Sequence, residues 1–408
     1  MIKAASVLAT LGMVGLLAGC ADPTKEELPA GPAAGTDAAD APVDAMSGAS
    51  APAAEAGQSI SFESAGMQLE LEEVTRTGGV VWAMDFIDSN TMIFTERSGK
   101  LSLMQLDSAE ITEITGGPEV MQTETGGVFN VYVDPDFASN QSLYFTYVKA
   151  VEAGSTIALA RAQLEGTELI DLDDLFLANN ASDDHAHWGS RVVMDKDRFL
   201  FMTSGERHVP DNAQNLASHG GKVLRFNEDG SVPDDNPYAG QEDAAPEVWS
   251  IGHRNPQGLA IHPETGRLFE QEHGPTGGDE INIIDKGNNY GWPVITHGEN
   301  IWGGQLPEGT EREGMEQPLK YFKPGIAPSG MNFYYGDNYP GWNGNLFNAT
   351  LRGHLHRIVL DGERVVGEER LLQQWGERLR DVVQGPDGLL YIATETGAIA
   401  RIVPAESP

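Results

Sequence analysis

Several residues that can bind charged groups lie close together in residues 251–293 of this 408-residue chain. The stretch holds an Arg-Asn pair at Arg254 and Asn255, a Gly-Pro pair at 274–275, an Asp-Glu pair at 279–280 and an aromatic end, YGWP. Guanidinium groups bind carboxylates through paired hydrogen bonds, whereas carbonyl and carboxylate oxygens are the ligands that calcium prefers. The stretch therefore predicts a site that holds an anionic ligand against a hard cation.

Two histidines form a second candidate site in the segment DHAHWGSR, residues 184–191. A neutral imidazole is suited to removing a proton near neutral pH, so His187 or His185 could act as a general base. Two alternatives stay open at this point: an exposed loop residue without a role, or a zinc site formed by both histidines. No cysteine or third histidine clusters with them in the sequence, which does not favour zinc.

Two further arginines, Arg378 and Arg380, stand at alternate positions in the segment ERLRD. Alternate residues of an extended segment point to the same side, so both guanidiniums could face one ligand. The alternative for any single arginine is an ordinary surface ion pair. The net charge of −35 makes these arginines more informative, because an acidic protein that binds an anion must build a local basic pocket.

A repeated phrase predicts the elements that position these residues. An apolar strand, a turn rich in Asp, Pro and Gly, a second apolar strand and a Gly- or Thr-rich exit recur from residues 82, 128, 192, 259, 331 and 382. Alternating apolar residues bounded by turns predict strands, and repeats of this kind predict a β-propeller. Six copies predict an all-β, six-bladed β-propeller, in which residues 68–75 could close the ring against the last repeat. A pair of β-sandwiches is the alternative, but it does not explain the repeated phrase.

The first residues of the chain predict export. Lys3 precedes a short apolar run, residues 4–17, which is followed by Leu-Ala-Gly and Cys20. One positive charge, a short apolar core and small residues are typical of a secretory signal and not of a membrane span. Cys20, the only cysteine of the chain, resembles the lipidated first residue of a bacterial lipoprotein. The alternative is an ordinary signal peptide with an incidental cysteine.

Composition then predicts three segments. Residues 1–20 are expected to be the lipoprotein signal peptide, and residues 21–60, rich in Ala, Pro, Gly and Asp, a disordered tether that cannot bury enough apolar surface to fold. Residues 61–408 are expected to form the propeller domain. We expect an exported, membrane-anchored lipoprotein that faces the periplasm, and Ala21 favours the outer membrane. The acidic charge excludes nucleic acid as a partner and leaves only the lipid anchor for membrane contact.

Three motifs together resemble a known family: HRNPQG at 253–258, DEIN at 279–282 and NYGWP at 289–293. They are similar to the soluble aldose sugar dehydrogenases that depend on pyrroloquinoline quinone (PQQ), relatives of soluble glucose dehydrogenase in the glucose/sorbosone dehydrogenase-like family. The resemblance extends, with gaps, from Gly78 to Val403. It implies a quinoprotein oxidoreductase that uses PQQ and calcium to oxidise the anomeric hydroxyl of an aldose to a lactone, and then passes electrons to an external acceptor.

The resemblance also implies roles for individual residues. His187 matches the catalytic base of the family. The positions that match contacts with PQQ are Arg254, Asn255, Arg352, Arg378 and Arg380. The positions that match calcium ligands are the backbone carbonyls of Gly274 and Pro275 at the cofactor, and Glu280 with the Tyr290 backbone at a second, structural ion.

Some positions depart from the family pattern. Ala186 stands where glucose-oxidising relatives carry Asp before the base, so Asp184 or a remote residue would have to orient His187. Thr125 replaces a Gln, and a Tyr beyond NYGWP is replaced near Ile301. Lys323 lies in a changed segment and could restore a contact with a carboxylate of the cofactor. These changes concern substrate identity and cofactor affinity more than the fold.

Two other functions remain as alternatives. A propeller lipoprotein that has lost catalysis could bind a ligand or a protein partner instead. A hydrolytic propeller such as a calcium lactonase would need several carboxylates and asparagines around one metal, and the sequence does not show that arrangement. Retention of His187 together with the two arginine pairs favours the dehydrogenase.

Overall fold

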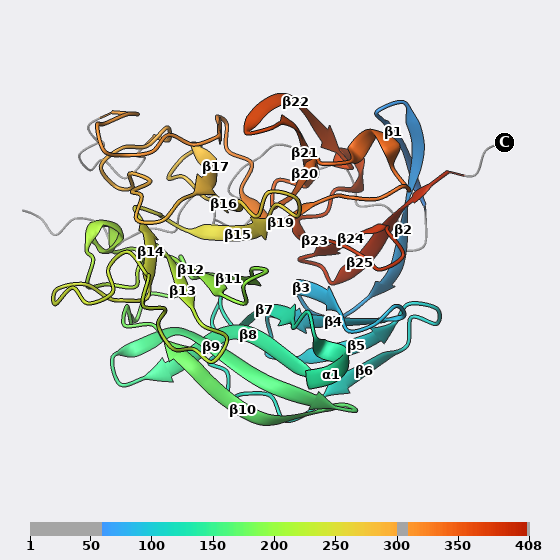
Figure 1. The fold of residues 1–408 in the computed structure, drawn as a ribbon. Helices are drawn as coiled ribbons and strands as arrows, with labels where there is room; N and C mark the ends of the chain where they lie inside the picture. Colours follow the sequence, from blue (N-terminus) through green and yellow to red (C-terminus); the bar gives the residue numbers. More distant parts are fainter. Residues whose placement is uncertain (1–58, 300–308, 406–408) are drawn as a thin grey trace, which may run out of the picture. The chain divides into compact units, whose positions relative to one another are not determined.

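The computed structural model describes residues 59–299 and 309–405, which form six antiparallel β-sheets. Five of the sheets have four strands and one has five. The sheets stand around a common centre as the blades of a ring, here numbered 1 to 6 in chain order from residue 81 (Figure 1). The prediction of an all-β, six-bladed β-propeller is confirmed. The predicted signal peptide, Cys20 and nearly all of the predicted tether lie outside the described residues.

Each blade is a meander of consecutive strands, and blade 6 also includes two strands from the beginning of the described chain. Blades 1 and 2 comprise β3 (Val81–Phe86), β4 (Thr91–Glu96), β5 (Leu101–Gln105), β6 (Ile111–Ile114), β7 (Val128–Val133), β8 (Ser142–Val151), β9 (Gly154–Glu165) and β10 (Glu168–Leu177). Blades 3 and 4 comprise β11 (Gly189–Met194), β12 (Leu200–Ser204), β13 (Lys222–Phe226), β14 (Val248–Ile251), β15 (Pro256–Ile261), β16 (Leu268–Glu272), β17 (Asp279–Ile284) and β18 (Lys320–Phe322). Blades 5 and 6 comprise β19 (Pro328–Phe333), β20 (Leu346–Thr350), β21 (His354–Asp361), β22 (Arg364–Leu371), β23 (Leu379–Gln384), β24 (Leu390–Thr394), β25 (Ala398–Pro404), β1 (Ile60–Ser64) and β2 (Met67–Arg76).

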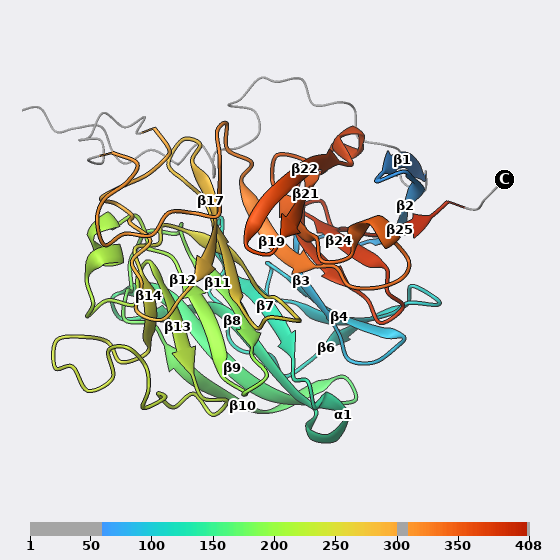
Figure 2. The same cartoon turned by 45° about the horizontal axis from the view of Figure 1, so that its top comes forward.

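The six repeated phrases of the sequence correspond to the first two strands of the six blades. The first strands are in contact from blade to blade around the ring. In both views β7, β11 and β19 lie nearer the middle of the ring than the outer strands β6, β10 and β22 (Figures 1 and 2). The repeat is therefore strongest in sequence where each blade contributes to the centre.

Strand β4 shows why these inner strands are apolar on both faces. Met92 and Phe94 pack with Tyr391 and Ile399 of blade 6, whereas Ile93, which points to the opposite face, belongs to the core shared with blade 2. All three β4 side chains are at most 1% exposed. Because successive residues of a strand face opposite sides, a strand between two neighbouring blades must be apolar at almost every position.

Hydrogen bonds between blades reinforce this packing. Buried polar side chains of one blade donate to backbone carbonyls at the start of the next blade. The pairs are Thr95 to Phe129 at 2.6 Å, Thr146 to Ser190 at 2.6 Å, Thr203 to Pro256 at 2.9 Å, Gln271 to Ser329 at 2.8 Å and Ser329 to Arg380 at 2.7 Å. These bonds fix the inner strands relative to one another, so loops that follow them are held at defined positions.

The ring closes through the N-terminal end of the described chain. β2 pairs antiparallel with β25, with Leu69 opposite Pro404, and β1 pairs with β2 at the edge of the same sheet. This confirms the prediction that residues 68–75 complete the last repeat. Helical segments are short: α1 (Phe137–Asn140) and three 3-10 turns, Pro210–Gln214, Pro340–Trp342 and Gln373–Trp375. Over the described ranges, no helix has the length and apolar character needed to cross a bilayer.

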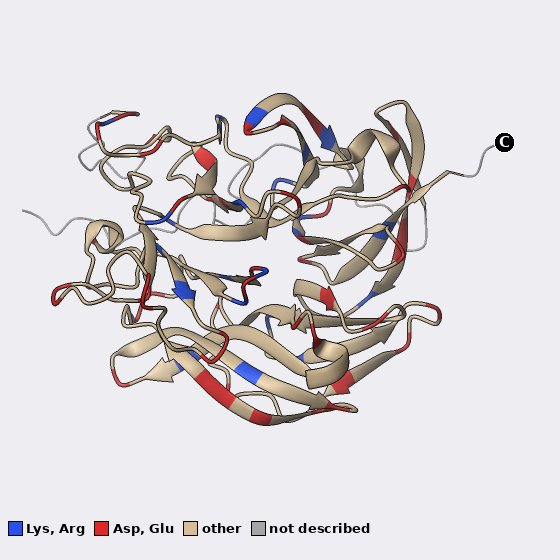
Figure 3. Cartoon of the chain, viewed as in Figure 1, with Lys and Arg blue, Asp and Glu red and all other residues tan. Residues whose placement is uncertain are grey.

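Charge is distributed unevenly over the blades. The outer strand β10 reads ELIDLDDLFL and carries a long acidic stretch, whereas several basic segments lie toward the middle of the ring (Figure 3). Exposed acids on an edge strand discourage pairing with other chains. The few basic residues near the centre are therefore the ones to examine for binding.

Candidate active site

The predicted site residues lie at one end of the ring. His187 comes two residues before β11, Asn255 directly before β15, and Arg378 directly before β23, which are all first strands of their blades. Gly274 and Arg352 each follow a second strand by two residues, β16 and β20. In an antiparallel pair the start of the first strand and the end of the second meet at the same edge. The fold thus gathers residues from blades 3, 4, 5 and 6 on one face.

His187 is held by a buried carboxylate. Its Nδ1 lies 2.7 Å from Oε1 of Glu206, and both side chains are 1% exposed. Glu206 follows the second strand of the same blade, so the loops at the two strand ends bring the pair together. A carboxylate on Nδ1 fixes the tautomer that carries its proton there and leaves Nε2 as the basic nitrogen. The orienting carboxylate is therefore the remote Glu206, and Asp184 does not take this place.

Asp184 instead orients a second imidazole. Its Oδ2 lies 2.8 Å from Nδ1 of His208, and the His208 ring packs edge-on against His187 with centroids 3.9 Å apart. His185, the alternative base, is exposed, and its backbone carbonyl accepts a hydrogen bond from the Trp188 indole at 3.0 Å. The two neighbouring histidines of the sequence thus have different places: His187 in a buried pair and His185 at the surface.

The backbone around this pair is strained. His187, Arg207 and His208 have φ angles of +49°, +60° and +53°, in the left-handed region that side chains other than glycine seldom adopt. Such residues cost free energy and cluster where function requires an unusual geometry. The loops of His187 and Glu206 also approach each other closely, because a Cβ at Gly205 would lie 2.0 Å from the His187 carbonyl oxygen. Only glycine at this position allows the two loops to meet.

Short hydrogen-bonded links connect the pair to the Arg254–Asn255 segment. The Glu206 backbone N–H donates to the Arg254 carbonyl at 2.9 Å, and the Asn255 side-chain oxygen accepts from the Gly189 N–H at 3.3 Å. Arg254 in turn donates from Nη1 to the His273 carbonyl at 3.3 Å, next to Gly274. The structure therefore brings His187, the Arg-Asn pair and the start of the Gly-Pro loop into one connected region.

Arg378 and Arg380 face one carboxylate, as their alternate spacing predicted. Nε of Arg378 lies 2.5 Å from Oε2 of Glu395, and Arg380 contacts the other oxygen of the same group. Burial alone would raise the pKa of Glu395, but the charges of Arg380 and Arg378 outweigh it and hold the pKa below its ordinary value. Burial and the same two positive charges lower the pKa of Arg97, which comes directly after β4. Three guanidiniums thus surround one acid, an excess of positive charge that favours an anionic ligand.

Arg191 connects the inner strands beneath this face. It is buried, and its guanidinium donates to the Gln257 carbonyl at 3.0 Å and to the Arg380 carbonyl at 3.3 Å, and forms an ion pair of 3.0 Å with Asp381. Since Arg191 itself stands on β11, one side chain joins blades 3, 4 and 6. A buried ion pair of this kind fixes geometry more than it adds stability. Arg191 therefore positions the three strands that carry the predicted site.

The Gly274–Pro275 loop lines a cavity of about 400 Å³ together with Arg352 and Lys323. Asp279 shapes the loop, because its carboxylate accepts the backbone N–H groups of Gly274 at 3.0 Å, Ile326 at 2.7 Å and Ala327 at 2.6 Å. Asp279 is therefore committed to the backbone and is not a free metal ligand. Lys323 lies at the cavity but its ammonium is 2.7 Å from Glu299.

Glu280 and Tyr290 line a second, much narrower pocket with Arg254, Glu272 and Trp292. Burial, followed by the nearby charge of Glu272, raises the pKa of Glu280 well above its ordinary value. The Arg254 guanidinium lies 5.3 Å from the Trp292 ring, so the aromatic end of the 251–293 stretch covers the arginine. The changed position near Ile301 lies outside the described residues.

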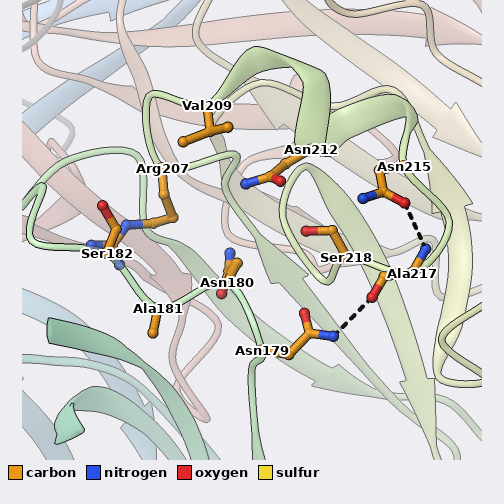
Figure 4. A pocket seen from close by; sticks show the side chains of 10 residues that line it. All are labelled: Asn179, Asn180, Ala181, Ser182, Arg207, Val209, Asn212, Asn215, Ala217 and Ser218. Carbon is orange, nitrogen blue, oxygen red and sulfur yellow. Dashed lines mark hydrogen bonds between the residues drawn. The ribbon is translucent and has the colours of Figure 1, made fainter. Parts of the chain in front are cut away.

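A polar cavity of about 410 Å³ lies in blade 3, and Arg207, the residue after Glu206, is part of its lining. It is lined by the segment before β11 and by the loop between β12 and β13, including Arg207 and Val209 on either side of His208. Figure 4 shows the polar ends of Asn180, Asn212 and Ser218 directed toward the space between them. Amide and hydroxyl groups of this kind suit a ligand rich in hydroxyls.

Sequence reasoning missed three of these residues. Glu206 lies in the segment SGERH, which matches no known motif. Arg97 directly follows β4 and belongs to no motif either. Arg191 is part of the segment around His187, but its role depends on strands that are far apart in sequence. Thr125, which stands where the family carries Gln, makes a contact of its own. Its hydroxyl accepts the Trp188 indole N–H at 3.1 Å and so helps to hold the loop of His187.

Comparisons with known proteins agree with the resemblance seen in the motifs. The Glucose / Sorbosone dehydrogenase family model matches residues 79–401. The aldose sugar dehydrogenase YliI of Escherichia coli is 36% identical over 332 residues, covering 79% of this chain and 90% of that protein. The crystal structure of the soluble aldose sugar dehydrogenase from Escherichia coli in the apo-form matches with a TM-score of 0.80 and 34% identity, over 83% of this chain and 100% of that one. The PQQ-bound aldose sugar dehydrogenase from Streptomyces coelicolor matches with a TM-score of 0.68 and 25% identity, over 82% of this chain and 98% of that one. The chain belongs to the glucose/sorbosone dehydrogenase family.

Proposed function

We propose that this protein oxidises the anomeric hydroxyl of aldose sugars to lactones, with PQQ and calcium as cofactors. The observation that carries the proposal is the buried His187–Glu206 pair at the end of the ring where the arginines gather. Family membership supports a sugar dehydrogenase, and the Streptomyces coelicolor relative is a PQQ-bound protein. A binding protein without catalysis would not need a buried base with a fixed tautomer.

His187 acts as the general base in this proposal. Glu206 holds the proton on Nδ1, so Nε2 can accept the proton of the anomeric hydroxyl. The carboxylate then stabilises the imidazolium that forms, which keeps the proton on the protein until it is released to water. PQQ, when bound, supplies an electron-poor quinone that accepts the hydride from the sugar.

The arginines fit the carboxylates of PQQ. Arg378 and Arg380 share Glu395, and Arg97 adds a third positive charge beside them. Arg254 and Asn255 lie next to the His187 pair, and Arg352 lines the Gly274 cavity. In a chain of net charge −35 such a local excess of positive charge favours a strongly anionic ligand. These residues would hold and orient the cofactor.

The donor set near Gly274 fits calcium. In the described part of the chain, the backbone carbonyls of Gly274 and Pro275 accept no hydrogen bond, and both residues line the 400 Å³ cavity. Carbonyl oxygens are hard ligands suited to calcium. A second calcium would use the Glu280 carboxylate and the Tyr290 carbonyl, which line one pocket. The ion at Gly274 would make the quinone more electrophilic, and the second would brace the loop that follows β17.

The polar cavity that Asn180, Arg207 and Asn212 line would take the sugar. Its asparagine and serine side chains offer both donors and acceptors, which neutral hydroxyl groups require. The identity of the preferred sugar would follow from kinetics with a panel of aldoses.

The proposal is tested by dye reduction with purified protein that begins after Cys20. We expect activity with aldoses that requires both added PQQ and added calcium. PQQ binding is measured in parallel by calorimetry, with Arg378→Ala and Arg380→Ala as weakened variants. If the protein binds PQQ but oxidises no aldose, the proposed reaction is contradicted. If it binds no PQQ, the result favours the alternative function, a propeller that binds a ligand or a protein partner without catalysis.

We also propose that the protein is exported and anchored through a lipid on Cys20, facing the periplasm, with residues 21–60 as a tether to the propeller. The LAGC segment and the composition of the following residues support this. Its electrons would pass to an external acceptor on the same side of the membrane. Mass spectrometry of the N-terminal peptide would detect the lipid, and Cys20→Ser should move the protein from the membrane fraction to the soluble fraction.

A further inference from the structure

Blade 4 contains a polar cluster that the proposed reaction does not use. In the register of β16 and β17, Glu270 stands opposite Asn282, and Glu272 stands opposite Glu280. Residues directly opposite one another in an antiparallel pair share a face, so three carboxylates and one amide lie on the same face. All four side chains are buried. Buried strand positions in this protein are otherwise mostly apolar.

His253 joins this cluster from the loop before β15. Its Nδ1 lies 3.3 Å from Oε1 of Glu272 and 3.7 Å from Oε2 of Glu270. Its Nε2 lies 2.9 Å from the Ser250 hydroxyl, and its ring stacks on Tyr290 with centroids 4.9 Å apart. The atoms of His253, Glu270 and Glu272 that can bind a metal all lie within 4.8 Å of one another.

The cluster has more negative charge than its neighbours balance. Within the described residues, the ion pairs of Glu270 and Glu272 are with His253 alone. Buried carboxylates normally have a compensating charge, because an unpaired ionised group is expensive to remove from water.

Two oxygens in the cluster also lack hydrogen-bond donors. Oε1 of Glu270 and Oδ1 of Asn282 are buried and accept no hydrogen bond in the described structure. The Asn282 amide nitrogen donates to Glu270 at 3.0 Å and to Glu272 at 3.4 Å, which places the amide group between the two carboxylates. Buried acceptors in folded proteins nearly always have a partner. Unmatched acceptors beside excess negative charge indicate a cation.

We propose that His253, Glu270 and Glu272 bind a divalent cation inside blade 4. One imidazole nitrogen among oxygen donors suits a first-row metal such as Mn²⁺ or Zn²⁺, whereas calcium prefers oxygen alone. The Ser250 hydroxyl can accept the Nε2 proton of His253 and so leave Nδ1 to bind the metal. This site shares no ligand with the calcium positions proposed at Gly274 and Glu280.

The cation would fix two segments that carry proposed cofactor contacts. Glu272 ends β16, directly before His273 and Gly274, and its carboxylate also accepts the backbone N–H of Arg254. His253 directly precedes Arg254 in the chain. A metal between His253 and Glu272 would therefore hold the Arg254 segment against the Gly274 loop. The metal itself is structural and does not depend on the proposed sugar oxidation.

The test uses the whole chain, stripped with chelator, returned to excess Ca²⁺ to fill the calcium positions, and then equilibrated with Mn²⁺ or Zn²⁺. After gel filtration, elemental analysis should find one equivalent of the added metal per chain, and the metal should raise the melting temperature. Glu270→Gln keeps the shape of the side chain but removes its charge, and we expect its affinity for the metal to fall at least about tenfold.

Two matched variants locate the site. Glu242→Gln changes an exposed glutamate and should bind the metal like the wild type, whereas Glu270→Gln should not. The proposal is overturned if the wild type retains no Mn²⁺ or Zn²⁺, a result that does not depend on the folding of any variant. It is also overturned if Glu270→Gln retains the metal with the affinity of the wild type, or if Glu242→Gln loses the metal to the same extent.

Discussion

Two histidines of this protein each lie against a buried glutamate, in very different surroundings. His187 and Glu206 are 2.7 Å apart in loops at the end of blade 3, with one carboxylate and strained backbone. His253 and Glu272 are 3.3 Å apart inside blade 4, where Glu270 and Glu280 add two further carboxylates. The first pair is buried among loops, and the second is buried among regular strands.

The difference in charge separates the two roles. An imidazole beside one carboxylate forms a neutral assembly when it gains a proton, so the proton can be taken up and given back. An imidazole beside three carboxylates remains in a negative environment whether or not it is protonated, which suits a bound cation. The same two residue types thus support proton transfer in one place and metal binding in the other, and the predictions below test this contrast.

The largest expected effect is on catalysis, in His187→Ala. Loss of the general base should lower kcat about 10²- to 10⁴-fold, measured by dye reduction with PQQ, calcium and a saturating aldose. His185→Ala is the matched control, since that histidine is exposed two residues away, and its kcat should stay near the wild-type value. Equal losses in the two variants would show that the loop and not the base is responsible.

A smaller loss is expected in Glu206→Gln. The amide can no longer stabilise the imidazolium or hold the tautomer firmly, so kcat should fall about 10²-fold while KM changes little. The pH at which activity appears should also move, which a purely structural defect would not produce. Asp184→Asn, which alters the partner of His208, should have a weaker effect on kcat, and the reverse order would assign the orienting role to Asp184.

The enclosed cluster should respond to pH when divalent cations are removed. Burial raises the folded-state pKa of Glu270 above that of the unfolded chain, so the folded protein binds its proton more tightly. The free energy of unfolding in chelator should therefore fall as the pH rises above about 4.5, the ordinary range of a glutamate. Denaturant unfolding at pH 5 and pH 8 measures this, and Glu270→Gln should reduce the difference. A wild type that gains stability from pH 5 to pH 8 in chelator would contradict the expectation.

The smallest expected effect is on sugar binding at the polar cavity. Asn212→Ala removes one hydrogen-bonding side chain, which should raise KM for an aldose about fivefold with kcat nearly unchanged, because one such bond contributes about 1 kcal/mol. Asn227→Ala lies at the other end of blade 3 and serves as the control. Unchanged KM in Asn212→Ala would place the sugar elsewhere on this face.

The inner half of the fold was predictable from the sequence and the outer half was not. Strands such as β4 are buried on both faces between blades, so their apolar pattern recurs with the blade. Outer strands face solvent on one side and follow no common pattern: β10 is acidic, and β22 alternates exposed and half-buried residues. The repeat therefore identified six blades and the first two strands of each.

The residues of the site also differ in how well the sequence predicts their positions. The positions of His187, Arg254 and Arg378 could be placed at the ring's end because each comes a few residues before a predicted first strand. Glu206 could not be placed from the sequence. It reaches His187 only because two loops meet, and Gly205 allows them to meet. Glu270 and Glu272 also gave no signal, because alternate glutamates on a strand are typical of a solvent-facing side. Tertiary packing turned that side inward.

The pairing of β2 with β25 has a consequence for how the chain is made. Leu69 meets Pro404, so β2 finds its partner only after β25 has been synthesised. Contacts between such distant parts of a chain form slowly, because a long loop must close before they are made. Until then blade 6 is incomplete and the edges of its strands are open to other chains. The step most exposed to aggregation is therefore expected to be the last one, and a chain truncated before β25 should remain an open ring.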